Sequence, residues 1–125
     1  MKGQRILVVD DEPEACELMK EVLDSLGYDS IATTSAKEAL SLVENDNFDL
    51  AMIDIRMPEM DGRSLLKAIK MGHRDLPVMV ITGYGSAMAP EEMSALGADG
   101  YLAKPFMIED VRRMLLELLG KPERS

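Results

Sequence analysis

Short apolar segments alternate five times with amphipathic helical patterns along this chain of 125 residues. The apolar segments are residues 6–9, 30–32, 50–55, 77–81 and 101–103. Strands that alternate with helices pair in parallel through right-handed crossover connections. The unbroken apolar character of residues 50–53 is typical of a strand that is covered on both faces. The pattern therefore predicts an α/β fold, a three-layer αβα sandwich around a five-stranded parallel sheet.

Start and stop signals for helices lie between the predicted strands. Ser35, with Glu38 three residues later, has the sequence pattern of a capping box. Gly27 suits the end of the first helix. Because proline is tolerated in the first turn of a helix but not in its interior, the fourth helix should begin near Pro90 and leave residues 86–89 as loop.

Composition excludes several classes of protein. The formal net charge of −9 argues against direct nucleic-acid binding, which depends on Lys and Arg neutralising phosphates. No stretch approaches the roughly 20 apolar residues that span a bilayer, and the start of the chain lacks the apolar core of a signal peptide. The single cysteine, Cys16, excludes an internal disulfide and suits a reducing cytosol. We expect Cys16 to be partly buried helix surface, and the chain to be one cytoplasmic domain with its core at about residues 5–119 and a tail or linker at 120–125.

Functional groups follow four of the five predicted strands. These groups are Asp10 and Asp11, Asp54, Thr82, and Lys104. In an open α/β sheet, ligands bind beyond the carboxyl ends of the strands, so the fold should gather these side chains at one edge. Crowded carboxylates repel one another unless a cation joins them, and Mg²⁺ prefers one or two carboxylates together with waters and phosphate oxygens. The sequence therefore predicts a magnesium site.

The same edge suits phosphoryl chemistry. The carboxylate of Asp54 could attack a phosphoryl group and form an acyl phosphate. Lys104 would supply a positive charge to a phosphoryl oxygen, and Thr82 a hydroxyl donor. The backbone amide of Gly83 is sterically easy to approach and would complete the cradle.

Four ordered motifs resemble the response-regulator receiver domain of two-component signalling. They are residues 9–12 (Val-Asp-Asp-Glu), 52–62 (Met-Ile-Asp through Met-Asp-Gly), 81–85 (Ile-Thr-Gly-Tyr-Gly) and 104–106 (Lys-Pro-Phe). The resemblance extends from about residue 5 to residue 119 and is greatest to receivers of nitrogen-regulator type. It implies a flavodoxin-like sheet of order 2-1-3-4-5. It also implies a phosphoacceptor signalling domain, not an enzyme, that receives its phosphoryl group from a sensor histidine kinase or a histidine phosphotransfer protein.

The resemblance assigns a role to each residue of the acidic edge. Asp54 would be the phosphoacceptor. Asp11 and Asp54 would bind Mg²⁺ directly, together with the backbone carbonyl of Arg56, and Asp10 would act mainly through a water. Arg56 and Tyr84 are bulky, and we expect them to hinder the water that hydrolyses the acyl phosphate.

The resemblance also implies a switch. Thr82 and Lys104 would hold the phosphoryl oxygens, and Tyr101 would change rotamer as Thr82 moves; simple packing of Tyr101 on the sheet is the alternative. The bond before Pro105 would be cis, which is inexpensive only for an X-Pro linkage. The face made by the fourth helix, fifth strand and fifth helix would contact partners or a second copy of the chain.

Two other functions use similar residues. A phosphohydrolase of the haloacid-dehalogenase type also attacks through an aspartate, but it carries an acid two residues later, where this chain has Arg56, and the chain has no room for a cap domain. A flavodoxin-like flavin carrier needs a phosphate loop rich in Ser, Thr and Gly after the first strand. The acidic residues 10–12 would repel that phosphate.

Overall fold

The computed structural model describes residues 4–54, 62–82, 90–95 and 97–120. Its strands are β1 (Arg5–Val9), β2 (Asp29–Thr33), β3 (Leu50–Asp54), β4 (Val78–Thr82) and β5 (Gly100–Ala103). Its helices are α1 (Pro13–Ser25), α2 (Ala36–Asn45), α3 (Gly62–Gly72), α4 (Pro90–Ala95) and α5 (Ile108–Leu119). Strands and helices alternate as predicted, and α4 begins at Pro90. No helix in these described ranges is long and apolar enough to cross a membrane.

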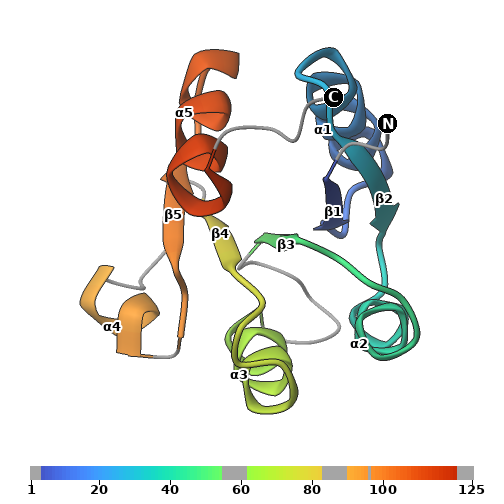
Figure 1. Cartoon of the computed structure of the whole chain (residues 1–125), viewed down its shortest axis with the longest axis vertical. Helices are drawn as coiled ribbons and strands as arrows, with labels where there is room; N and C mark the ends of the chain where they lie inside the picture. The colour runs from blue at the N-terminus through green and yellow to red at the C-terminus, as the bar shows by residue number, and fades with distance from the viewer. Residues whose placement is uncertain (1–3, 55–61, 83–89, 96, 121–125) are drawn as a thin grey trace.

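The strands form one parallel sheet in the order β2-β1-β3-β4-β5, which confirms the predicted topology. Figure 1 shows β2 and β5 at opposite sides of the molecule, with β1, β3 and β4 between them. The register pairs Asp54 with Ile81, and Thr82 with Ala103. The carboxyl ends of β3, β4 and β5 therefore lie side by side.

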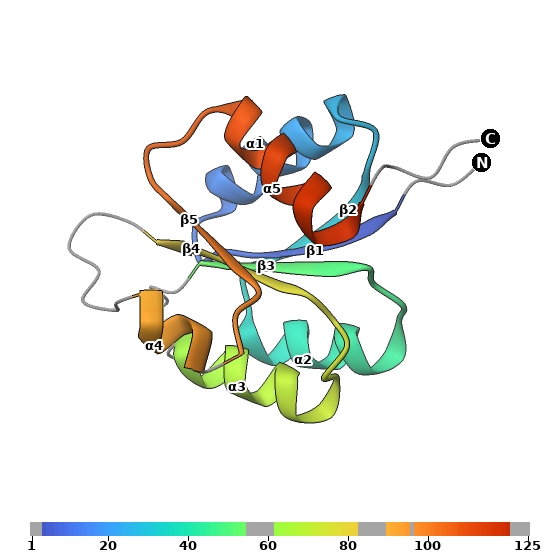
Figure 2. The same cartoon turned by 60° about the vertical axis from the view of Figure 1, so that its left-hand side comes forward.

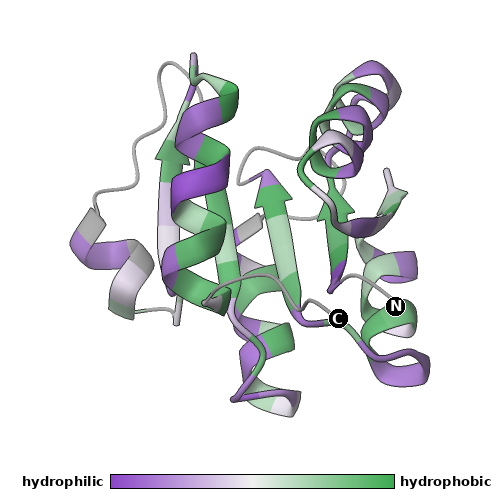
Figure 3. Cartoon of the chain, turned by 45° about the horizontal axis from the view of Figure 1, so that its top comes forward, coloured by the Kyte–Doolittle hydropathy of each residue, from purple (hydrophilic) through white to green (hydrophobic). Residues whose placement is uncertain are grey.

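Alternate side chains of each central strand enter two separate cores. In β1, Leu7 and Val9 pack with residues of α2 and α3, whereas Ile6 and Val8 pack with residues of α1 and α5. Figure 2 shows α1 and α5 on one face of the sheet and α2 and α3 on the other. In Figure 3 the central strands are mainly hydrophobic, while the helices alternate between hydrophobic and hydrophilic residues. Successive side chains of a central strand thus point to opposite faces of the sheet, and both faces are buried, as the apolar strand sequences predicted.

The capping prediction at α2 is half right. The hydroxyl of Ser35 accepts a hydrogen bond from the backbone N–H of Glu38 at 3.1 Å, so Ser35 is the N-cap. The side chain of Glu38, however, accepts a hydrogen bond from the hydroxyl of Thr33, and that hydroxyl accepts one from the backbone N–H of Ser35 at 3.1 Å. Thr33, at the end of β2, therefore occupies the place that a capping box gives to Glu38.

Lys70 ties the end of α3 to the start of β5. Its ammonium group donates to the carbonyls of Arg74 (3.0 Å) and Leu76 (2.8 Å) and to the carboxylate of Asp99 (3.1 Å). Gly97 makes room for the stem of Lys70, because a Cβ at this position would lie 2.9 Å from Lys70 Cγ. The backbone of Gly97 is also left-handed, with a φ of +107°.

We expect Gly97→Ala to lower the free energy of unfolding by about 1–3 kcal/mol, because alanine is strained at this φ and its Cβ displaces Lys70. Urea unfolding followed by circular dichroism measures the change. Gly72→Ala is the control, since a Cβ at position 72 would meet no atom within 4 Å and the backbone there does not have a positive φ. Equal urea midpoints for the two variants would contradict the prediction.

Candidate functional site

The carboxyl edge of the sheet gathers the predicted polar residues. Asp10 directly follows β1, Asp54 ends β3, Thr82 ends β4, and Lys104 directly follows β5. Asp10, Asp54 and Thr82 are each only 6% exposed. Parallel strands place their carboxyl ends at the same edge, so residues that are distant in sequence become neighbours here.

Three carboxylates form a cluster that suits a divalent cation. Asp10, Asp11 and Asp54 each offer one carboxylate oxygen, and these oxygens lie within 4.8 Å of one another. Asp10 Oδ1 accepts a hydrogen bond from the backbone N–H of Glu12 at 3.0 Å, which fixes the orientation of this carboxylate. Such a set of oxygens matches the ligands of Mg²⁺.

The cluster carries an electrostatic cost that a cation would relieve. Burial raises the pKa of Asp10 to about 6, and the charges of Asp54 and Asp11 act in the same direction. The N–H of Glu12 and the charge of Lys104 oppose this rise. Near neutral pH the protein thus holds crowded, desolvated negative charge, the condition under which metal binding is favourable.

Lys104 brings positive charge to Asp54. Its Nζ lies 3.4 Å from Asp54 Oδ2, and its side chain is 37% exposed. Its backbone N–H donates to the carbonyl of Thr82 at 2.7 Å, which joins it to the end of β4. The Lys104–Pro105 peptide bond is cis, as predicted. Because its side chain is partly exposed, the ammonium group of Lys104 is accessible to an incoming anion.

The other predicted site residues fall into two groups. Tyr101 pairs in register with Val80, two residues before the strand end, and is 42% exposed, so it lies outside the acidic cluster. Arg56, Gly83 and Tyr84, together with residues 86–89, lie outside the described residues, and the predictions made for them stay predictions.

Two residues that sequence reasoning did not assign to the site support its first carboxylate. The carbonyl of Thr33 accepts a hydrogen bond from the backbone N–H of Asp10 at 3.2 Å. Cys16 is fully buried, with 6% of the residue exposed, whereas we expected partly buried helix surface; its thiol donates to the carbonyl of Asp10. Burial raises the pKa of this thiol, which keeps it protonated and able to donate. The sequence held one signal for this support: β2 was the one predicted strand whose carboxyl end carried no residue assigned to the site.

An apolar groove opens beside the site, between α1 and α5. Its volume is about 530 Å³, and both Asp10 and Lys104 line it. Leu18 of α1 and Ile108 of α5 also line it, and they are 63% and 54% exposed. Figure 2 shows the two helices adjacent on one face of the sheet. The groove could therefore hold an apolar surface next to the acidic cluster.

We expect the affinity for Mg²⁺ to rise with pH. Below about pH 6 Asp10 is protonated and lacks the charge that attracts the cation, whereas above this pH it is ionised. Binding at pH 5 should be up to about tenfold weaker than at pH 7.5, because protons compete with the metal. Calorimetric titration with MgCl₂ measures this, and Asp10→Asn should flatten the profile. An unchanged profile in that variant would assign the pH dependence to another group.

Comparisons with known proteins agree with this geometry. The model of the family described as "Response regulator receiver domain" matches residues 6–116. Sporulation initiation phosphotransferase F of Bacillus subtilis is 34% identical over 112 residues, which are 90% of each chain. Transcriptional regulatory protein ZraR of Escherichia coli is 37% identical over 92% of this chain, but the match spans 26% of ZraR. The crystal structure of response regulator TrrA from Thermotoga maritima, in complex with Mg²⁺-BeF, superposes with a TM-score of 0.84 at 33% identity and covers 93% of this chain and 99% of TrrA.

Proposed function

This chain belongs to the response regulator receiver domain family of two-component signalling, and from that premise we propose that Asp54 is its phosphoacceptor. The observation that carries the proposal is the placement of Asp54: its buried carboxylate lies within 4.8 Å of carboxylate oxygens of Asp10 and Asp11 and 3.4 Å from the ammonium nitrogen of Lys104. The comparisons give no support to the phosphohydrolase alternative.

The proposed step transfers a phosphoryl group from a phosphohistidine to Asp54. One carboxylate oxygen of Asp54 forms a bond to phosphorus as the bond from phosphorus to the imidazole nitrogen breaks. The nitrogen keeps the electron pair and takes up a proton. Lys104 lies 3.4 Å from Asp54 Oδ2 and would hold a phosphoryl oxygen, while the hydroxyl of Thr82 would hold another. The domain would thereby assist both its own phosphorylation and its own dephosphorylation.

We assign Mg²⁺ to the acidic cluster, with Asp11, Asp54 and the backbone carbonyl of Arg56 as direct ligands and Asp10 acting mainly through a water. The oxygens of the three carboxylates lie within 4.8 Å of one another, and the Mg²⁺ complex of TrrA supports the choice of metal. The ion would offset the repulsion between the carboxylate of Asp54 and an anionic phosphoryl group.

The groove between α1 and α5 is the proposed docking surface for the phosphodonor. Receiver domains interact with sensor histidine kinases or phosphotransfer proteins. A donor histidine must come within bonding distance of Asp54, so the donor protein has to cover surface next to the acidic cluster. The groove meets this requirement because Asp10 and Lys104 line it, and exposed Leu18 and Ile108 offer apolar contact.

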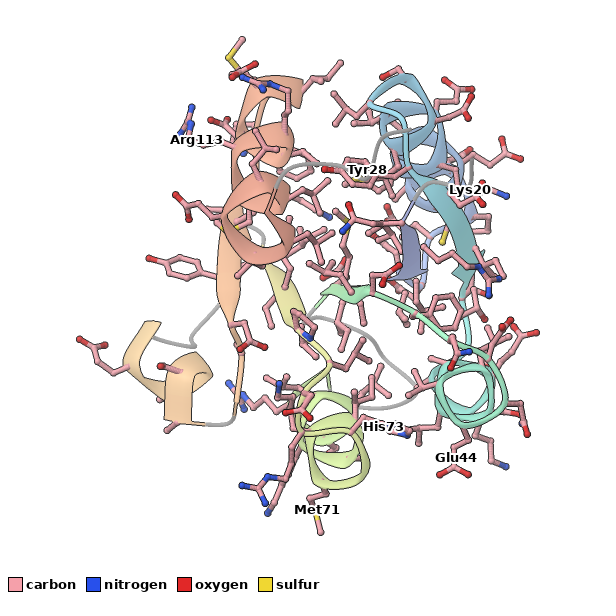
Figure 4. All side chains as sticks on the ribbon, viewed as in Figure 1. Lys20, Tyr28, Glu44, Met71, His73 and Arg113 are labelled. Atoms are coloured by element: carbon pink, nitrogen blue, oxygen red, sulfur yellow. The ribbon has the colours of Figure 1, made fainter. Side chains whose placement is uncertain are left out.

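We expect Leu18→Asp to slow phosphotransfer from a phosphorylated kinase about tenfold or more, since central apolar contacts dominate interface energies. Phosphorylation by acetyl phosphate should stay unchanged, because a small donor needs no docking surface. Met71→Asp is the control: Met71 is 75% exposed and points away from the body of the molecule in Figure 4. Equal transfer rates for Leu18→Asp and wild type would place the docking surface elsewhere.

We assign the signalling output of the domain, which is the surface that partners recognise, to the face formed by α4, β5 and α5. A cavity of about 370 Å³ lies on this face, lined in part by Tyr101 and Met114. The 42% exposure of Tyr101 supports a role as a switch that partners, or a second copy of the chain, can read. We also propose that residues 5–119 form the core of one receiver domain. We propose that it acts in the cytoplasm, which a chain with one cysteine suits.

Incubation with acetyl phosphate and Mg²⁺ tests the function. Intact-mass spectrometry should find one added phosphoryl group. Chelation of Mg²⁺ should prevent its addition, and borohydride reduction followed by peptide mapping should locate the acyl phosphate at Asp54. Labelling at a different residue, or none under conditions that label a known receiver domain, would contradict the proposal.

A further inference from the structure

A buried junction joins three elements behind the acidic cluster. The thiol of Cys16, in the first turn of α1, lies 3.3 Å from the carbonyl oxygen of Asp10 and 3.7 Å from that of Thr33, so its single hydrogen is shared between these two acceptors. The backbone N–H of Asp10 donates to the same Thr33 carbonyl at 3.2 Å. Cys16 and Thr33 are 6% and 5% exposed. The end of β1, the end of β2 and the start of α1 therefore meet at one thiol.

This junction acts on the backbone that carries the predicted metal ligands. Both backbone polar groups of Asp10 are held there, its N–H by Thr33 and its carbonyl by Cys16. The side chain of Asp10 is held separately by the N–H of Glu12. A shift of the end of β1 would move the carboxylates of Asp10 and Asp11 relative to Asp54. Even a displacement of the ligands below about 1 Å lowers the affinity of a binding site.

A buried cysteine is usually a small hydrophobic residue that fills space. The hydrogen bonding of Cys16 adds to that role. Its thiol is directed at two main-chain carbonyls at the ends of neighbouring strands, not only at apolar side chains.

We propose that Cys16 is a positioning residue for the metal site: its thiol holds the end of β1 against β2, so that Asp10 and Asp11 face Asp54 at a spacing that one divalent cation bridges. The inference rests on the proposed function, because it needs the acidic cluster to bind a cation. It adds a residue that touches neither cation nor phosphoryl group and acts through the backbone of Asp10.

Titration of the unphosphorylated protein with Mg²⁺ alone, followed by amide NMR, tests this proposal. Cys16→Ala removes the donor and should weaken binding about tenfold, the low end of what residues that orient metal ligands contribute. Cys16→Ser keeps a donor and should remain within about twofold of wild type. Leu23→Val is the matched control, because Leu23 is a fully buried residue of the same helix and lies in the hydrophobic core. If Cys16→Ala does not fold, Cys16→Val fills the space without a donor.

A second comparison separates positioning from a general loss of stability. In an Asp10→Asn background, Cys16→Ala should weaken Mg²⁺ binding by a smaller factor than in the wild-type background, because one of the two carboxylates that Cys16 positions is gone. In the wild-type protein, the resonances of Cys16 and Thr33 should titrate with Mg²⁺, whereas those of Leu23 should not.

The outcomes distinguish this inference from the proposed function. Equal affinities for wild type and Cys16→Ala, or wild-type resonances of Cys16 that ignore Mg²⁺, overturn the positioning role alone. An equal loss in Cys16→Ala and Leu23→Val also overturns it, because the effect is then one of core packing. A wild-type protein that does not bind Mg²⁺ overturns both this inference and the metal site.

Discussion

The Asp54→Asn protein should take up no phosphoryl group from acetyl phosphate in the presence of Mg²⁺, under conditions that label the wild-type chain. The amide of asparagine is a poor nucleophile and cannot form an acyl phosphate. Asp54 is only 6% exposed, but asparagine has nearly the same size and shape as aspartate and fits the same space. The replacement also removes one negative charge from a crowded cluster of carboxylates. We therefore expect the variant to stay folded, and intact-mass spectrometry to find only the unmodified protein.

Asp49→Asn is the matched control for this loss. Asp49 is exposed and lies just before the first residue of β3, whereas Asp54 is the last residue of the same strand. Its replacement should leave the labelling at the wild-type level. Labelling of the Asp54→Asn protein at a single site, with wild-type yield, would assign the phosphoacceptor to another residue.

The strand ends explain why so much of the site could be read from the sequence. Parallel strands that are buried on both faces have a nearly continuous apolar sequence, so the first polar residue marks where a strand leaves the core. That is where the structure has Asp10, Asp54, Thr82 and Lys104, and topology alone makes them neighbours. The prediction needed strand order and direction, and these follow from the alternation of strands and helices.

Contacts between elements explain what sequence could not supply. The hydroxyl of Thr33 takes the bond from Ser35 that a capping box would give to Glu38, because β2 ends two residues before the cap. The burial of Cys16 likewise depends on how closely α1 approaches the ends of β1 and β2. Such contacts depend on distances between elements, which a helical or strand period does not encode.

The Lys104→Met protein should be phosphorylated by acetyl phosphate about 100-fold more slowly than wild type, because loss of one preorganised charge at a reacting group typically costs two to three powers of ten. The Nζ of Lys104 is 3.4 Å from Asp54 Oδ2, near the place where the phosphoryl oxygens would gather charge. Methionine keeps most of the apolar stem, so the packing at the neighbouring groove should change little.

Lys67→Met is the control for Lys104→Met, since Lys67 is an exposed lysine of α3, and its removal changes the net charge of the protein by the same amount. If Lys104 acts only through the overall charge, the two variants should be slowed equally. If it holds a phosphoryl oxygen, only Lys104→Met is slow, while its affinity for Mg²⁺ is retained or increased, because a positive charge beside Asp54 has been removed. A labelling rate of Lys104→Met within twofold of wild type would exclude the proposed role of this ammonium group.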